Sequence, residues 1–230
     1  MAKSPMVILA LGLAAVVLSG AGLASGDPVE SVVTDTFFDG IKSKAADEGC
    51  PGKSFYTRQF FLDGAQANPD FGQGSTSDDG KREIAAFFAH FTHETGFMCY
   101  IEEKDGASKN YCDTNYPLWP CTPGQGYYGR GPLQLTWNYN YGAAGKSLQF
   151  NGLDNPDKVA QDQALTFQAA FWFWMTNVHQ VVPQGFGETT RKVNSGECNG
   201  GDAPAMNARA SYYVEYCKQF GVDPGNNLTC

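Results

Sequence analysis

The sequence predicts one mainly α-helical domain with long loops held by disulfides. Several segments repeat apolar residues with helical spacing, whereas strand-like alternation is sparse and short. Seven cysteines follow an export-type leader. Long connections rich in glycine, proline and asparagine join the helical segments. A chain of this kind buries a helical core and uses disulfides to hold its loops.

The first 26 residues have the layout of a secretory signal peptide. Lys3 precedes an apolar core from Val7 to Leu18, and small residues follow. We expect residues 1–26 to be removed, which leaves a single domain over residues 27–230. The apolar run is short for a membrane span, which needs about 20 apolar residues. We therefore expect a secreted, extracellular protein without a membrane contact.

Three segments carry the clearest helix signals. Asp27 is a suitable N-cap and Pro28 a suitable first residue for a helix within residues 27–45. Residues 81–95 form a second helix, and residues 162–178 are apolar nearly all round, as in a helix buried at the centre of a domain. The apolar stripe of the second helix consists of Ile84, Phe87, Phe88 and Phe91.

The cysteines predict three disulfides and one spare thiol. They are Cys50, Cys99, Cys112, Cys121, Cys198, Cys217 and Cys230. None of their spacings is CxxC, which argues against a structural zinc site. In residues 206–220 the positions Met206, Ala210, Tyr213, Val214 and Cys217 follow helical spacing. We therefore expect Cys217 to be the buried free thiol.

The charge balance argues against nucleic acid as a partner. The chain has 24 acidic and 16 basic residues, a formal net charge of -8, and no cluster of lysine or arginine that could follow phosphates. An acidic chain with 13% aromatic residues suits a neutral polysaccharide ligand. A net negative charge also keeps an exported protein soluble, and this is the commoner reason for such a charge.

Residues 89–100, AHFTHETGFMCY, concentrate histidine and glutamate in an apolar run. A zinc protease helix would need a histidine four residues after His93, and Phe97 stands there. A looser metal site from His90, His93 and Glu94 has no further ligand cluster to support it. We expect no metal and no cofactor.

Glu94 lies at the margin of the apolar stripe on the second helix, at 100° per residue. We expect its carboxyl to be half buried, and burial raises the pKa of a carboxyl because the charged form loses hydration. A raised pKa suits a general acid. The alternative is a glutamate at a helix end that hydrogen-bonds to nearby backbone, and this segment alone does not separate the two readings.

Candidates for a second carboxylate follow in a loop. Glu102, Glu103 and Asp105 lie between Cys99 and Cys112, which tether the loop near the end of the second helix. Acidic loop residues are usually only solvated. Two carboxylates on separate rigid elements, however, are what glycosidic bond hydrolysis requires: one protonates the leaving oxygen and the other activates water or attacks carbon.

Residues 127–142, YYGRGPLQLTWNYNYG, are rich in aromatics, amides and glycine. The segment lacks the GxGxxG spacing of a dinucleotide loop. The GKS at 145–147 would belong to a phosphate loop only if residue 140 were glycine, and Asn140 stands there. Aromatic faces and amides suit sugar rings, although aromatics in a core segment are commoner.

These motifs together resemble the family 19 glycoside hydrolases, the plant-type chitinases. The motifs FFAHFTHETG, YPLWPC, YYGRGPLQLTWNYNYG, VNSGEC and GNNLTC occur in the family's order over about residues 30–230. The resemblance implies a bilobal, mainly α-helical, lysozyme-like domain in the compact short-loop form that lacks a chitin-binding module. It implies a secreted endochitinase acting with inversion on chitin and chitooligosaccharides, and we expect a monomer.

Carried over residue by residue, the resemblance assigns the catalytic roles. Glu94 becomes the general acid and Glu103 the general base, with Glu102 as the alternative base. Thr136 occupies the position of a family serine that helps hold the nucleophilic water. The implied sugar-binding residues are His93, Trp119, Gln134, Tyr139, Asn140, Asn194 and Arg209. For each of these, structural packing is the alternative role.

The resemblance also implies the disulfide pairing Cys50–Cys99, Cys112–Cys121 and Cys198–Cys230, with Cys217 free. Only nine positions separate the two catalytic glutamates, so we expect few sugar subsites. Two rival functions stay open. One is a catalytically weak chitin-binding or ice-binding protein on this fold, against which the retention of both glutamates argues. The other is a lysozyme-like enzyme that acts on bacterial peptidoglycan.

Overall fold

The computed structural model describes residues 28–45, 49–74 and 77–230, so the expected signal peptide and the Asp27 cap lie outside the described residues. Within these ranges the chain is helical, and its β-structure is limited to two isolated bridges. The α-helices are α1 (Pro28–Val32), α2 (Asp35–Lys42), α3 (Gly52–Phe55), α4 (Arg58–Gln66), α5 (Asp78–Thr95), α6 (Asn138–Leu148), α7 (Lys158–Gln161), α8 (Gln163–Phe173), α9 (Phe186–Val193) and α10 (Ala203–Gln219). The shorter turns are η1 (Gly106–Ser108), a π-helical turn η2 (Trp174–Val178), η3 (His179–Gln184) and η4 (Ser195–Glu197). The mainly α-helical prediction is confirmed.

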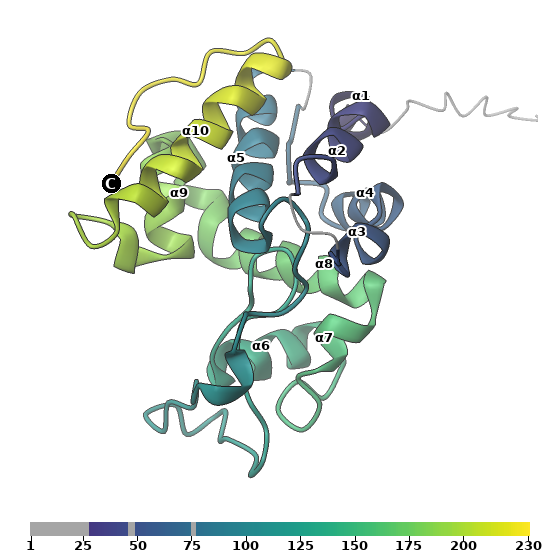
Figure 1. The fold of residues 1–230 in the computed structure, drawn as a ribbon, viewed down its shortest axis with the longest axis vertical. Helices are drawn as coiled ribbons and strands as arrows, with labels where there is room; N and C mark the ends of the chain where they lie inside the picture. Colours follow the sequence, from purple (N-terminus) through teal and green to yellow (C-terminus); the bar gives the residue numbers. More distant parts are fainter. Residues whose placement is uncertain (1–27, 46–48, 75–76) are drawn as a thin grey trace, which may run out of the picture.

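Two hydrophobic cores divide the domain into a large and a small lobe. The large core surrounds α5 and draws on α1, α2, α4, α9 and α10. The small core contains Tyr127, Leu135, Tyr141, Ala144, Val159, Leu165 and Ala169. In Figure 1, α5 lies between α10 and the purple-blue N-terminal helices, whereas α6 and α7 form the lower part of the molecule. The bilobal expectation is therefore met in the packing.

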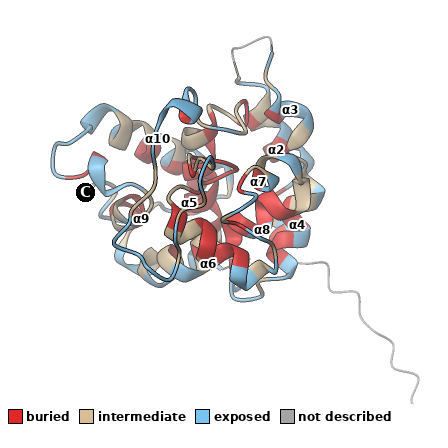
Figure 2. Ribbon diagram, turned by 90° about the horizontal axis from the view of Figure 1, so that it is seen from below, coloured by how far each residue is buried: buried red, intermediate tan, exposed pale blue. Residues whose placement is uncertain are grey.

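Helix α8 belongs to both cores, which explains its apolar sequence. Phe167 and Phe171 pack into the large core, and Leu165 and Ala169 pack into the small one. Figure 2 shows buried residues concentrated along α5, α8 and α6. A helix with only one buried face would alternate with polar residues, so the all-round apolar pattern reflects its position between the lobes.

Helix α5 carries the acid candidate and has favourable ends. The Ser77 hydroxyl accepts from the Gly80 amide at 3.2 Å, and Asp78 and Asp79 complement the helix N-terminus. Gly96 ends the helix with a left-handed φ of 57°, a conformation that glycine adopts without steric cost. All four residues of the predicted apolar stripe are fully buried.

Two sequence expectations need correction. The helix expected within residues 27–45 is two helices, because extended Thr34 interrupts it and its side chain caps α2 by accepting from the Phe37 amide at 3.2 Å. In α10, Tyr213 and Cys217 are buried as expected, but Val214 is 38% exposed. The face of α10 that packs on α5 is therefore narrower than the apolar stripe in the sequence.

The three disulfides pair as the family resemblance implies. Cys50–Cys99 joins the residues after α5 to the start of α3, Cys112–Cys121 closes a loop of the small lobe, and Cys198–Cys230 ties the C-terminus to the end of η4. Cys217 is free and buried, and burial raises the pKa of its thiol to about 11. In the part of the chain that the structure describes, no helix is long and apolar enough to cross a membrane.

Candidate active site

A cleft of about 780 Å³ receives residues from both lobes. Eight of the ten residues carried over from the family line it: His93, Glu94, Glu103, Gln134, Thr136, Tyr139, Asn140 and Asn194. The large lobe contributes the end of α5 and the residues around Asn194, and the small lobe contributes the others. Trp119 and Arg209 are not among the lining residues.

The acid candidate Glu94 sits in the last turn of α5 with 17% of its side chain exposed, so the half-buried expectation is met. Its Oε1 accepts from Nη2 of Arg209 at 2.5 Å. Burial raises the pKa of Glu94, and the Arg209 charge and hydrogen bond offset that rise only in part. The charges of Glu197 and Glu103 raise this pKa further. The carboxyl is thus prepared to hold a proton, as a general acid requires.

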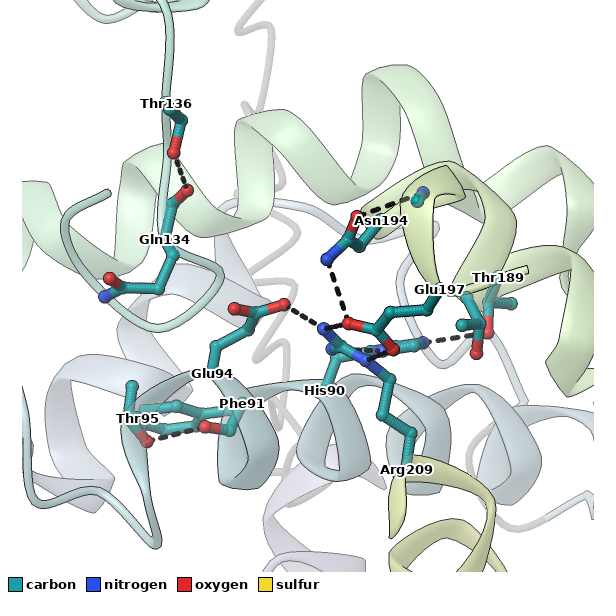
Figure 3. Close-up of polar contacts among 12 residues, drawn as sticks. His90, Phe91, Glu94, Thr95, Gln134, Thr136, Thr189, Asn194, Glu197 and Arg209 are labelled. Atoms are coloured by element: carbon teal, nitrogen blue, oxygen red, sulfur yellow. Dashed lines mark hydrogen bonds and ion pairs between the residues drawn. The ribbon is translucent and has the colours of Figure 1, made fainter. Parts of the chain in front are cut away.

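Arg209, on α10, organises the residues behind Glu94. Its Nε and Nη2 donate to the two carboxylate oxygens of Glu197 at 2.7 and 2.6 Å, and its Nη1 contacts Nδ1 of His90 at 3.1 Å. Figure 3 shows the guanidinium between Glu94, Glu197 and His90. Only 1% of Arg209 is exposed, so its position opposes the expected direct sugar contact and places it as a support for Glu94.

Glu197 links this buried group to the cleft surface, and the sequence reasoning missed it. Nδ2 of Asn194 donates to Oε1 of Glu197 at 2.9 Å, so one carboxylate holds both a cleft residue and the guanidinium of Arg209. Glu197 is 4% exposed. Its place in the VNSGEC motif, three residues after Asn194, was the available signal.

The base candidate Glu103 has a different environment. Its Oε1 accepts from Nζ of Lys109 at 2.5 Å and from the Tyr111 hydroxyl at 2.8 Å, and its Oε2 accepts from the Gly129 amide at 3.2 Å. Partial burial alone would raise the pKa of Glu103, but these hydrogen bonds and the Lys109 charge hold it below its ordinary value. Glu103 is therefore ionised under conditions in which Glu94 holds its proton.

Glu102, the alternative base, is hydrogen-bonded to two side chains of the small lobe. Its Oε1 accepts from Nε of Arg130 at 3.2 Å and from the Tyr128 hydroxyl at 3.3 Å. Arg130 is buried, and its guanidinium lies 3.6 Å from the Tyr128 ring centroid. This arrangement makes Glu102 part of the packing of the small lobe, although it also borders the cleft. Sequence reasoning missed Lys109 and Tyr111, which hold Glu103, although both lie within the three residues before Cys112.

Thr136 lies on the small-lobe wall of the cleft. Its hydroxyl donates to the Gln134 carbonyl at 2.7 Å, which Figure 3 also shows. Because the single hydroxyl proton is used there, the oxygen is left to accept a hydrogen bond from another group.

An aromatic wall continues from Thr136. Trp137 and Tyr139 both line the cleft, and their rings are stacked with centroids 6.1 Å apart and an interplanar angle of 10°. Trp137 adopts φ 76°, which is rare for a residue with a side chain and costs of order 1–3 kcal/mol. Such strain often accompanies function. Trp137 was not among the predicted sugar contacts, and the aromatic density of residues 127–142 was the signal for it.

Trp119 packs on α6 of the small lobe, and its sugar contact stays a prediction. Its indole packs on Gly142, where a Cβ atom would lie within 2.4 Å of it. Its carbonyl oxygen accepts from Nδ2 of Asn138 at 2.7 Å. His93, in contrast, borders the cleft, and burial followed by the Arg209 charge lowers its pKa to about 4. The His93 imidazole is therefore neutral above that pH.

Comparisons with known proteins agree with this geometry. Residues 32–183 match the family described as class I chitinase. Chitinase 5 of Oryza sativa subsp. japonica is 61% identical over 207 residues, which are 90% of this chain and 72% of that relative. Endochitinase A of Zea mays is 59% identical over 203 residues, with 88% and 72% coverage.

Solved structures give the same result. The family GH19, class IV chitinase from Zea mays aligns with a TM-score of 0.82 and 57% identity, over 87% of this chain and 98% of that one. Chitinase C from Streptomyces griseus HUT6037 aligns with a TM-score of 0.71 and 35% identity, over 86% and 97%. These alignments confirm the fold that the resemblance implied.

Proposed function

This chain belongs to the glycoside hydrolase family 19 chitinases, and on that premise we propose that it is a secreted endochitinase that inverts the anomeric configuration. The observation that carries the proposal is the pair of carboxyls in one cleft, one buried with a raised pKa and one hydrogen-bonded with a lowered pKa. Opposite shifts of this kind separate an acid from a base.

The proposed reaction uses each carboxyl once. Glu94 protonates the glycosidic oxygen while the bond from that oxygen to the anomeric carbon breaks. Water attacks that carbon from the opposite face and gives its proton to Glu103. Glu94 becomes a carboxylate, which Arg209 stabilises through the hydrogen bond it already makes. Proton exchange with solvent then restores both groups.

Thr136 fits the role of a second holder of the water. A water that donates one hydrogen to Glu103 and the other to the free lone pairs of Thr136 presents its own lone pair to the anomeric carbon. The added methyl group relative to serine leaves the hydroxyl in the cleft wall.

Sugar binding is assigned to the walls of the cleft. Trp137 and Tyr139 offer aromatic faces to the C–H faces of sugar rings. The polar groups that line the cleft near them and can pair with hydroxyl and acetamido groups are those of His93, Gln134, Asn140 and Asn194. The combination of apolar platforms and a few placed polar groups is typical of specific small-molecule sites.

The deciding experiment incubates the purified protein with a chitin hexamer and follows the first products by NMR. Inversion yields the α-anomer as the newly formed reducing end. A β-anomer would instead require the close carboxyl spacing of a retaining enzyme, about 5–5.5 Å. Bacterial cell walls serve as the comparison substrate, since turnover of walls without turnover of the hexamer would favour a lysozyme-like enzyme. Binding of the hexamer without turnover would favour a carbohydrate-binding protein.

A further inference from the structure

A buried histidine stands behind the acid candidate. His90 lies on α5 one helical turn before Glu94 and is fully buried. Its ring stacks on Phe186 with centroids 4.9 Å apart. Nδ1 faces Nη1 of Arg209 at 3.1 Å, and Nε2 faces the Thr189 hydroxyl at 2.9 Å. The function proposed above assigns no role to either His90 or Thr189.

The hydrogen bonds determine the tautomer of His90. The Thr189 hydroxyl donates its only proton to the Phe186 carbonyl at 2.7 Å, so its oxygen can only accept from His90. Nε2 must therefore carry the proton. Arg209 has donors and no acceptor, so the bare lone pair of Nδ1 faces it. Burial followed by the Arg209 charge lowers the pKa of His90, which keeps the ring neutral.

We propose that Thr189 and His90 form a positioning pair that sets the orientation of the Arg209 guanidinium against Glu94. The inference rests on the proposed role of Glu94 as the acid. Glu197 holds Nε and Nη2 of Arg209, and His90 supplies the acceptor for Nη1. Because the guanidinium is planar, an acceptor at Nη1 restricts the rotation that would move Nη2 away from Glu94. The opposite tautomer would place two N–H groups against each other.

The test is Thr189→Val, which preserves shape and removes the acceptor for Nε2–H. The Nε2–H of the buried imidazole then has no acceptor, which disfavours the tautomer that presents the Nδ1 lone pair to Arg209. The hold of Arg209 on Glu94 weakens as a result. Arg209 lowers the pKa of Glu94, whereas Glu197 and Glu103 raise it, so a weaker hold raises this pKa. The basic limb of the kcat profile on the chitin hexamer should move up by about 0.5 pH unit or more.

Thr190→Val is the matched control. Thr190 is equally buried and its hydroxyl donates to the same Phe186 carbonyl at 3.4 Å, whereas the hydroxyl that pairs with His90 is that of Thr189. We expect Thr190→Val to leave the limb in place and Thr189→Ser to restore the parent profile. A Thr189→Val enzyme with lower kcat and an unmoved limb would overturn the positioning role.

A second pair of variants applies if Thr189→Val does not fold. His90→Asn keeps an acceptor near the position of Nδ1, whereas His90→Leu removes it. The limb should move further in His90→Leu than in His90→Asn, and equal limbs would contradict the inference. If the parent protein does not hydrolyse the hexamer, the proposed function fails, whereas an active parent with equal limbs removes the positioning role alone.

An independent observation concerns the loop of residues 113–120, closed by the Cys112–Cys121 disulfide. Its tip exposes 44% of Tyr116 and 82% of Leu118, which with Val214 are the exposed large hydrophobic residues of the described chain. The side chain of Asn138 holds both ends of the loop, through the Asp113 amide at 2.8 Å and the Trp119 carbonyl at 2.7 Å. The apolar tip is thus presented on a fixed loop.

The tip continues the aromatic wall of the cleft. The ring of Tyr116 stacks on Tyr139 with centroids 4.1 Å apart, and Tyr139 in turn stacks on Trp137 inside the cleft. Exposed apolar groups that continue a binding wall mark a contact surface. We infer that Tyr116 and Leu118 bind the part of a chitin chain that extends beyond the cleft, which deepens the proposed function.

The test compares the double variant Tyr116→Ala/Leu118→Ala with Val214→Ala, which removes an exposed apolar side chain on α10. The measured quantity is the rate on insoluble chitin divided by the rate on chitin tetramer. We expect this ratio to fall about fivefold or more in the double variant, as for the loss of a stacking contact worth about 1 kcal/mol. It should stay constant in Val214→Ala. An unchanged ratio in the double variant would contradict chitin binding by Tyr116 and Leu118. A parent protein without chitinase activity would instead count against the proposed function.

Discussion

At the residue scale, the two carboxyls differ because their neighbours differ. Glu94 has one cationic partner and a buried position, whereas Glu103 accepts from three donors at the cleft surface. Glu94→Gln keeps the shape and removes the transferable proton. We expect turnover of the chitin hexamer to fall by roughly 10²-fold or more. Calorimetry should still detect hexamer binding, and a variant with more than about a tenth of parental turnover would contradict the acid role.

The same contrast predicts the pH profile. The rate should fall at low pH as Glu103 takes up a proton and at high pH as Glu94 loses one. Lys109→Met removes a hydrogen bond and a charge that lower the pKa of Glu103, so that pKa rises and the acidic limb of kcat moves to higher pH. Lys146→Met, an exposed change on α6, is the control and should leave the limb unmoved. An acidic limb that is the same in parent and Lys109→Met would argue against Glu103 as the base.

At the element scale, the disulfides decide how the loop after α5 is held. Cys50–Cys99 fixes the chain four residues before Glu103. Replacing both cysteines with alanine should lower the free energy of unfolding by about 2–5 kcal/mol, measured in urea. Cys217→Ala removes only a buried thiol and should lower the free energy of unfolding by less.

A thiol reagent should detect one reactive group, that of Cys217, in the denatured parent and none in the native protein. Detection of three free thiols would refute the pairing.

At the scale of the whole molecule, the cleft takes one wall from each lobe, and α8 joins their cores. A chain bound across both walls should stabilise the fold, because it binds only the native state. In Glu94→Gln, the hexamer at 100 times its Kd should raise the free energy of unfolding by about 2.7 kcal/mol. Calorimetry should show a higher Tm with the chitin hexamer than with a glucose hexamer, which lacks acetamido groups. Equal shifts for both sugars would argue against chitin specificity.

Local patterns were sufficient for the features that one segment determines. The apolar stripe of α5 predicted the half-buried position of Glu94, because side-chain direction along a helix follows from its period. Family motifs led to the disulfide pairing and to eight of the residues that line the cleft. Thr34 shows the limit of this reasoning, since a single cap divided a helix whose flanking residues favoured continuation.

The sequence by itself determined where the central helices α5 and α8 lie, which face of α5 is apolar and that Glu94 is half buried, since these depend on neighbours within a few turns. Only the tertiary structure decided what surrounds that glutamate. Arg209 reaches Glu94 across 115 positions because α10 packs on α5, and the same packing buries Arg209 away from the sugar. Likewise, Trp119 and Trp137 both lie in aromatic-rich loops before α6. Only the fold shows that Trp119 packs against Gly142 and that Trp137 lines the cleft. Spacing along the chain cannot specify such encounters, because they depend on which faces of distant elements meet.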